Sequence, residues 1–247
     1  LEASRHTDSV KSVVVVTTDK VYKNNEWGYG YRENDELGGH DPYSASKACA
    51  ELVIESYRKS FSMTNANTPL IASARAGNVV GGGDWTENRI IKDAVMAASN
   101  DKRVLIRSPN SSRPWQHVLE PLSGYLLLGQ HLHQKKMDVA ESWNFGPALS
   151  SNVIVKDLIK LMGQEWNKVV GEISKNSKSE HEAQSLMIDS TKARCKLGWE
   201  PIWDIKRTVQ NTIEWYRTYL ERNLVITAEQ IRKYVSEAKE NKLVWAY

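Results

Sequence analysis

Features that often decide the class of a protein are scarce or missing in this chain of 247 residues. Its two cysteines, Cys49 and Cys195, are too few for a disulfide framework and have no metal-ligand spacing, which favours a reducing compartment. No apolar run approaches the length of a membrane span, and the opening stretch "LEASRHTDSV" is too polar for a signal peptide. We therefore expect no metal, no membrane contact and a cytoplasmic location.

Glycine-rich phosphate motifs are also missing. The sequence has no G-x-G-x-x-G turn and no G-x-x-x-x-G-K-[ST] loop. The nearest stretch is "GNVVGGGDW", which follows an expected strand but has Thr86 in the place of the third glycine. The chain also begins at Leu1 and not at a methionine.

The remaining composition is that of an ordinary globular protein, with 40% hydrophobic and 26% charged residues and a net charge of +3. A chain of this length can bury a sizeable core. The mild positive charge fits a site for an anionic metabolite. The basic residues are spread out along the chain, so we expect no nucleic-acid partner.

Apolar runs alternate with amphipathic segments along the sequence. Residues 12–18 contain four consecutive valines and predict a fully buried strand, because such runs suit a parallel sheet covered on both faces. Asp41 and Pro42 are typical of a helix N-cap and first position, and we expect that helix to continue to about Ser60. Further strands are expected within residues 68–80, 104–108 and 142–147, and further helices within residues 88–100, 120–134, 154–166, 204–223 and 227–247. This alternation predicts an α/β fold with a parallel sheet.

Reactive groups follow the valine-rich strand. Thr18, Asp19 and Lys20 stand where it ends, and in open parallel sheets ligands bind beyond the carboxyl ends of the strands. Tyr43 and Lys47 are four residues apart and share one face of the expected helix. An ammonium beside a phenol stabilises the phenolate, and a tyrosine placed in this way can take a proton from a sugar hydroxyl.

Each of these signals also has a simpler explanation. Tyr-x-x-x-Lys is compatible with an ordinary exposed helix pair, and Thr-Asp at a strand end is often a turn or a cap. Their order along the chain strengthens the interpretation as a site, because a strand, Thr-Asp-Lys, a Tyr-x-x-x-Lys helix and a second strand leading to Asn78 follow one another.

Longer stretches between Val13 and Tyr219 carry a family resemblance. They are "TTDKVY", "DPYSASKACAELV", "ARAGNVVGGGDW", "NRIIKD", "RPWQHVLEPLSGYL", "WNFGP" and "KLGWEP". These stretches resemble the extended short-chain dehydrogenase/reductase family of nucleotide-sugar enzymes, and within it the CDP-glucose 4,6-dehydratases. The resemblance implies a lyase that uses NAD, takes CDP-glucose as substrate, forms a homodimer and serves deoxysugar biosynthesis.

The resemblance also implies roles for the strand-end and helix residues. Tyr43, assisted by Thr18 and Lys47, would take the proton from the glucose 4-hydroxyl while NAD accepts hydride from C4. Asp19 would protonate the 6-hydroxyl as water leaves, for which the acid has to be protonated near neutral pH. Hydride would then return to C6, giving CDP-4-keto-6-deoxyglucose. Thr17, Tyr43 and Lys47 are the candidates for cofactor contacts.

Lys20 stands where the resemblance implies a difference between subfamilies. The dTDP-glucose dehydratases carry a glutamate at this position as the base at C5, whereas the CDP-glucose group carries lysine, as this chain does. A lysine base has to be neutral, so Lys20 is either that base or a charge partner of Asp19.

The candidate substrate contacts come later in the chain. Asn78 matches a sugar-binding position of the family. Arg89 and Arg113 are candidates for the pyrophosphate, because a guanidinium fork fits phosphate oxygens, although each is also compatible with a solvated surface arginine. His117 would face the base and ribose, or else be a buried structural histidine.

Together with the expected elements, the resemblance implies the following architecture: the C-terminal portion of a Rossmann-type parallel sheet, plus a smaller mixed α/β substrate-binding domain. We expect residues 1–80 to form the remaining dinucleotide-binding part and residues 81–222 the substrate domain, with residues 140–147 returning to the sheet. Residues 223–247 would form a helical tail or a packing arm.

Because the glycine-rich turn is missing, we expect the first strands and helices of the family's fold to lie upstream of Leu1. The strand at Val13–Val16 would then present an apolar edge. Two alternatives to the expected activity remain: another NAD-dependent nucleotide-sugar dehydratase or epimerase, and a non-catalytic remnant that keeps only dimer contacts through the helix after Pro42.

Overall fold

A computed structural model describes residues 1–64, 67–148, 151–174 and 185–247. The chain divides into two compact units, and one of the boundaries between them falls within the first turn of a helix. The first unit comprises Leu1–Gly77, Pro121–Gly146 and Met187–Glu200, and the second comprises Asn78–Glu120, Pro147–Leu186 and Pro201–Tyr247.

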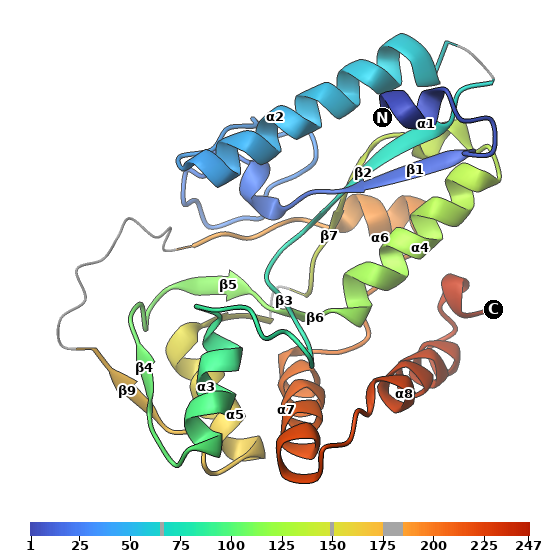
Figure 1. Cartoon of the computed structure of the whole chain (residues 1–247). Helices are drawn as coiled ribbons and strands as arrows, with labels where there is room; N and C mark the ends of the chain where they lie inside the picture. Colours follow the sequence, from blue (N-terminus) through green and yellow to red (C-terminus); the bar gives the residue numbers. More distant parts are fainter. Residues whose placement is uncertain (65–66, 149–150, 175–184) are drawn as a thin grey trace. The chain divides into compact units, whose positions relative to one another are not determined.

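The first unit is built on a parallel sheet. Its strand order is β1 (Ser12–Val16), β2 (Leu70–Ala76) and β7 (Ser142–Phe145). Helix α2 (Pro42–Tyr57) runs along one face of the sheet and α4 (Leu119–His133) along the other (Figure 1). The predicted α/β architecture with a parallel sheet is confirmed. Shorter elements of this unit are α1 (Glu2–Arg5), η1 (Asp19–Val21), η2 (Arg58–Ser62), η3 (Met137–Val139) and α6 (Thr191–Leu197).

The strand β1 is less enclosed than its valines predict. All residues of β2 are buried, whereas those of β1 are only partly buried and Val16 is 49% exposed. Within the described residues β1 pairs with β2 alone, so one of its edges has no neighbouring strand. The prediction of a fully buried strand at residues 12–18 is therefore wrong, because a run of valines does not reveal whether a strand is central or at an edge.

Helix α2 begins where the sequence predicts. The Asp41 carboxylate accepts a hydrogen bond from the backbone N–H of Ser44 at 3.0 Å, which caps the helix, and Pro42 occupies its first position. The α-helical part ends at Tyr57, and the turn Arg58–Ser62 continues with π-type hydrogen bonding. The expected end at Ser60 falls inside this turn.

The second unit packs three helices around an apolar core. They are α3 (Ile90–Ser99), α5 (Val155–Glu165) and α7 (Ile205–Arg222), and their buried faces share one cluster that includes Leu158 and Ile213. In the described part of this unit, the strands form three short pairs. These are parallel β3 (Val79–Val80) with β6 (Gln116–His117), parallel β4 (Val104–Ile106) with β9 (Gly171–Ile173), and antiparallel β5 (Ser112–Pro114) with β8 (Asn152–Ile154). The sequence predicted β4 but not its partner β9, because only the pairing with β4 identifies Gly171–Ile173 as a strand.

The C-terminal helix α8 (Thr227–Glu240) is a packing arm and not a free tail; the turn η5 (Val244–Ala246) follows it. The buried carboxylate of Glu120 accepts hydrogen bonds from the Tyr234 hydroxyl at 2.7 Å, the Trp203 N–H at 2.7 Å and the Ile202 N–H at 3.0 Å. Burial raises the pKa of Glu120 to about 7. One carboxyl group thus joins α8 to the segment that precedes α7.

The two units and the expected domains differ in detail. The first unit ends at Gly77, close to the expected boundary at residue 80, but it also includes Pro121–Gly146 and Met187–Glu200. The C-terminal residues group with the second unit. The assignment of one unit to the cofactor and the other to the substrate stays a prediction. Among the residues described, no helix combines the length and the apolar character needed to cross a bilayer.

Two glycines of α4 provide a test of packing in the first unit. A Cβ atom added at Gly124 would lie 2.3 Å from a ring carbon of Phe145, whereas one at Gly129 would make an ordinary 3.7 Å contact with Val14. We expect Gly124→Ala to lower the free energy of unfolding by about 1–3 kcal/mol through overpacking. Gly129→Ala should raise it by about 0.5–1 kcal/mol, because alanine favours helix. Urea unfolding of both variants measures this, and changes of the same sign would contradict the packing described for α4.

Candidate active site

The end of β1 carries three reactive side chains into a short 3-10 turn, η1. Thr18 caps this turn: its hydroxyl accepts a hydrogen bond from the Lys20 N–H at 3.3 Å and donates one to the Asp19 carboxylate at 3.1 Å. Asp19 is only 2% exposed, whereas the Lys20 side chain is exposed. The strand end thus holds one buried carboxyl, one half-buried hydroxyl and one exposed ammonium.

The first turns of α2 bring a phenol and a second ammonium to the same place. Tyr43 is 51% exposed, and the Nζ atoms of Lys20 and Lys47 lie 5.9 Å and 5.8 Å from the centre of its ring. Tyr43 and Lys47 share one face of α2, as their spacing predicts. The structure therefore brings the strand-end group and the helix group together within the first unit.

A second tyrosine lies near Asp19, on the helix that covers the other face of the sheet. Tyr125 of α4 packs edge-on against Phe145, with ring centres 5.6 Å apart. Burial raises the pKa of the Tyr125 phenol, and the nearby Asp19 carboxyl, when ionised, raises it further. Asp19 thus has the burial that a general acid requires.

Thr17 lies one residue before this group but is turned inward. Its hydroxyl donates a hydrogen bond to the buried carboxylate of Glu51 at 2.5 Å, and its N–H extends the β1–β2 ladder to the carbonyl of Ala74 at 2.8 Å. A cofactor contact by Thr17 stays a prediction. The structure gives its side chain a partner inside the protein.

The candidate substrate residues all belong to the second unit. Asn78 precedes β3, and its carbonyl accepts the Gln116 N–H at 3.0 Å, next to the β3–β6 pairing that aligns Val80 with His117. His117 is buried against the ring of Trp203, with centres 4.7 Å apart, and its Nδ1 accepts the Leu119 N–H at 3.3 Å. Burial lowers the pKa of His117 to about 4, so the imidazole is neutral. This is the environment that a structural histidine requires.

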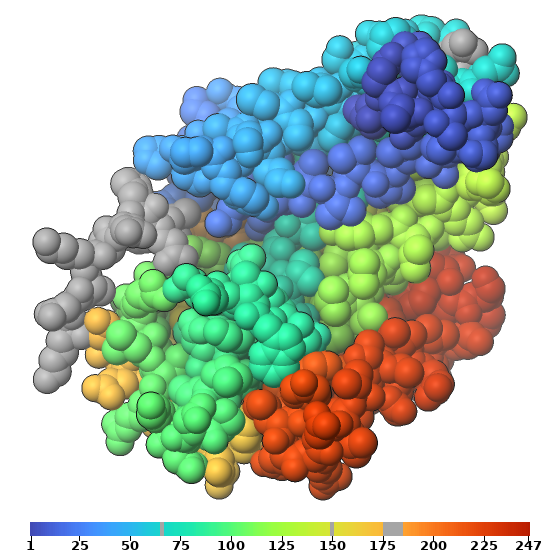
Figure 2. All heavy atoms as spheres, in the orientation of Figure 1, coloured from blue at the N-terminus to red at the C-terminus, as the bar shows by residue number. Residues whose placement is uncertain are grey.

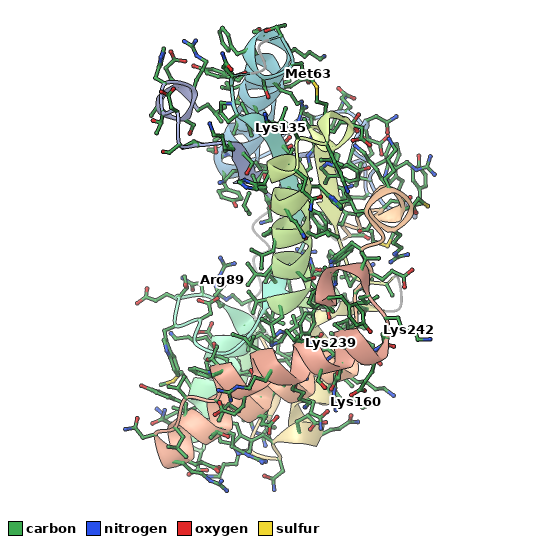
Figure 3. The ribbon with its side chains drawn as sticks, turned by 90° about the vertical axis from the view of Figure 1, so that its right-hand side faces the viewer. Met63, Arg89, Lys135, Lys160, Lys239 and Lys242 are labelled. Atoms are coloured by element: carbon green, nitrogen blue, oxygen red, sulfur yellow. The ribbon has the colours of Figure 1, made fainter. Side chains whose placement is uncertain are left out.

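The two candidate arginines differ in environment. Arg113 is buried, with Nη1 donating to the carbonyl of Ser112 at 2.8 Å, so it is not a solvated surface residue. Arg89 precedes α3 and is exposed, and its side chain projects away from the ribbon (Figure 3). Of the two, Arg89 has the environment of an ordinary surface residue.

The sequence interpretation missed two charged residues beside the strand-end group, Glu51 and Arg75. Each carried a readable signal. Glu51 stands four residues beyond Lys47 on the same helix face, and Arg75 is the one charged residue in the otherwise uncharged strand "LIASARA". A charge in a buried strand indicates a buried partner, although not which one.

Comparison with known proteins places the chain in a family. A family described as GDP-mannose 4,6-dehydratase matches residues 1–212. CDP-glucose 4,6-dehydratase of Salmonella typhimurium is 41% identical over 242 residues, which cover 96% of this chain and 67% of that protein. The dTDP-glucose 4,6-dehydratase of Streptomyces griseus is 26% identical, over 88% of this chain and 61% of that protein.

Solved structures share the fold. The NAD complex of dTDP-glucose 4,6-dehydratase from Bacillus anthracis aligns with a TM-score of 0.69 at 21% identity, covering 85% of this chain and 63% of that one. A UDP-glucuronic acid 4-epimerase from Bacillus cereus, in complex with UDP-glucuronic acid and NAD, aligns with a TM-score of 0.73 at 18% identity, covering 88% and 64%. The fold is therefore that of the Rossmann-type short-chain dehydrogenases/reductases.

Within that class, the chain belongs to the GDP-mannose 4,6-dehydratase family of nucleotide-sugar enzymes. It spans about two thirds of the length of the Salmonella and Bacillus anthracis proteins.

Proposed function

We propose that this chain provides the catalytic and sugar-binding parts of an NAD-dependent dehydratase that converts CDP-glucose to CDP-4-keto-6-deoxyglucose. The observation that carries the proposal is the grouping of Thr18, Asp19 and Lys20 at one strand end with Tyr43 and Lys47 on the adjacent helix. The likeness to the Salmonella CDP-glucose 4,6-dehydratase supports the choice of substrate.

The first proton transfer falls to Tyr43. Its half-exposed phenol has two ammonium groups within 6 Å of the ring centre, and nearby positive charge stabilises the phenolate that a base requires. The phenolate oxygen takes the proton from the sugar 4-hydroxyl. Thr18 offers a hydroxyl at the strand end that can hold the same sugar oxygen.

The elimination of water needs an acid and a base on neighbouring atoms of the sugar. Asp19 is the acid in this proposal, because its buried carboxyl can deliver a proton to the 6-hydroxyl. Lys20, the next residue, is the base that removes the C5 proton. Its exposed side chain reaches toward the Tyr43 ring, with Nζ 5.9 Å from the ring centre.

The residues present fit one end of the cofactor. A phenol and an ammonium on one helix face, beside a strand-end hydroxyl, form a donor set suited to the hydroxyls of a ribose, and Tyr43 and Lys47 would hold that ribose. When bound, the nicotinamide ring accepts hydride from C4 and returns it to C6. The sequence offers no G-x-G-x-x-G turn for the pyrophosphate.

In the second unit, Arg113, Asn78 and Arg89 are the groups proposed to meet the nucleotide sugar. Arg113 is buried, and a buried guanidinium is a strong ligand for phosphate oxygens because it is weakly screened by water. His117 is neutral, so we propose that it contributes no charge to binding of the nucleotide sugar.

Turnover tests the proposal. The protein incubated with CDP-glucose and NAD⁺ should form a product lighter by one water, detected by mass spectrometry, and faster from CDP-glucose than from dTDP-glucose. Tyr43→Phe should lower kcat by about a hundredfold or more, because it removes the general base.

Tyr57→Phe is the matched control, since Tyr57 lies on the same helix and its hydroxyl donates to Glu2 in a surface contact at 3.2 Å. That variant should keep the wild-type rate. A folded protein that forms no product, or a Tyr43→Phe variant with full activity, would contradict the proposed function.

We also propose a homodimer formed through α2. This helix lies at the surface of the first unit (Figure 2). Its residues Leu52 and Val53 are 56% and 52% accessible. Sedimentation analysis should give twice the monomer mass for the wild type and the monomer mass for Leu52→Glu, because the buried charge would oppose association. Leu224→Glu, at an equally exposed leucine of the second unit, should remain dimeric. A monomeric wild type, or a dimeric Leu52→Glu variant, would rule this surface out.

A further inference from the structure

A buried ion pair lies directly behind the candidate active site. Arg75 of β2 donates from Nη2 to the Glu51 carboxylate of α2 at 2.8 Å, and the two side chains are only 3% and 2% exposed. Buried pairs of this kind contribute little net stability, because desolvation of the charges offsets their attraction. Its presence therefore calls for an explanation other than stability.

The Glu51 carboxylate contacts the residue that immediately precedes the strand-end turn. Glu51 Oε1 accepts the Thr17 hydroxyl at 2.5 Å, and Thr17 immediately precedes Thr18. The other oxygen, Oε2, accepts the hydroxyl of Ser73 in the middle of β2 at 2.7 Å. One carboxylate thus joins helix α2 to the last residue before the reactive turn.

The Arg75 guanidinium contacts the residue that follows the turn. Arg75 Nη1 donates to the Tyr22 hydroxyl at 2.9 Å, and its guanidinium carbon lies 5.1 Å from the centre of the Tyr22 ring. Tyr22 is the residue that follows η1, and its own hydroxyl donates to Asn144 of β7 at 2.7 Å. The reactive turn is therefore tied at both ends, each time to a different member of one ion pair.

Helix geometry connects this pair to the phenol. Tyr43, Lys47 and Glu51 are spaced by four residues and lie on one face of α2, so Glu51 stands roughly two turns from Tyr43. A helix is stiff over that distance. The helix therefore keeps a fixed distance between Glu51, which contacts Thr17, and Tyr43, whose ring lies near Lys20.

The charges of the pair stabilise each other. Burial favours a raised pKa for the Glu51 carboxyl, but the hydrogen bond and charge of Arg75, together with the hydrogen bonds from Thr17 and Ser73, outweigh it and hold that pKa below its usual value. Burial also opposes the charge of Arg75, but its hydrogen bonds and electrostatic interactions with Glu51 and Tyr22 together outweigh burial, so the pKa of Arg75 is raised. Both groups are charged at neutral pH, and the hydroxyls of Thr17 and Tyr22 meet full charges.

We propose that Glu51 and Arg75 are positioning residues: together they fix the turn bearing Thr18, Asp19 and Lys20 against Tyr43 by holding its two ends. The inference rests on the proposed function, since it assigns the fixed geometry to proton transfer at the sugar. Misplacing reacting groups by about 1 Å can cost a hundredfold in rate, so a clamp on both ends of the turn has a direct catalytic effect.

The test removes one hydroxyl at a time and leaves the ion pair in place. Thr17→Val removes the hydrogen bond to Glu51 before the turn, and Tyr22→Phe removes the hydrogen bond to Arg75 after it. Each should lower kcat by about tenfold or more, with the KM values for the nucleotide sugar and NAD changed by less than about twofold. Ser73→Ala is the matched control, because it removes a hydroxyl from the same carboxylate without releasing the turn. It should keep kcat within about twofold, and Thr17→Ser should restore the rate.

Amide hydrogen exchange of the peptide that covers residues 18–22 provides a readout independent of turnover. It should speed up in Thr17→Val and Tyr22→Phe and not in Ser73→Ala. If the wild type shows no turnover, the proposed function fails, but this exchange pattern still supports the clamp. Equal exchange in all three variants would overturn it, as would a Thr17→Val effect confined to the KM for NAD, which would make Thr17 a cofactor ligand only.

Discussion

The arrangement of the first unit depends on the buried ion pair between Glu51 and Arg75. Three elements meet there: α2 supplies the carboxylate, β2 supplies the guanidinium, and the end of β1 supplies the hydroxyl that completes the carboxylate's contacts. Hydrogen bonds to ionised groups are stronger than those between neutral groups. The pair therefore fixes distances between elements that apolar packing alone would leave adjustable.

This network is polar in a part of the sheet that is otherwise apolar. Arg75 interrupts a fully buried strand, and its partners extend through Tyr22 to Asn144 on β7, whose side-chain amide donates to the carbonyls of Tyr31 and Asp189. A buried network of this kind is favourable only when its members are satisfied together, so it selects one arrangement of the elements. That selectivity suits a site where a carboxyl, an ammonium and a phenol have to act on neighbouring atoms of one sugar.

Much of the fold could be predicted from local patterns. The parallel strands, the capped start of α2 at Asp41 and the shared face of Tyr43 and Lys47 follow from β-branched runs, capping chemistry and helical spacing. The grouping of Lys20 with Tyr43 could also be predicted, because ligands of open parallel sheets bind beyond the strand ends, and the residues at the end of β1 and in the first turn of the next helix come in the order that such a site requires.

What escaped prediction depends on contacts between residues far apart in the chain. The exposure of Val16 reflects which strands neighbour β1, and no local pattern contains that information. The short strands β8 and β9 exist because a partner strand pairs with them. Arginine is usually a surface residue, but Arg113 is buried. Glu51 and Arg75 were readable as unusual charges, yet their pairing is a property of the tertiary structure.

The central claim is that one ion pair holds both ends of the reactive turn, and a double-mutant cycle tests it most directly. Steady-state turnover of wild type, Thr17→Val, Tyr22→Phe and the combined variant gives the coupling between the two hydroxyls. If both hydroxyls act on one turn, the first loss already loosens it. The kcat of the combined variant should then be only slightly below that of the less active single variant. Losses that multiply would mean that the two hydroxyls act independently and that no common clamp exists.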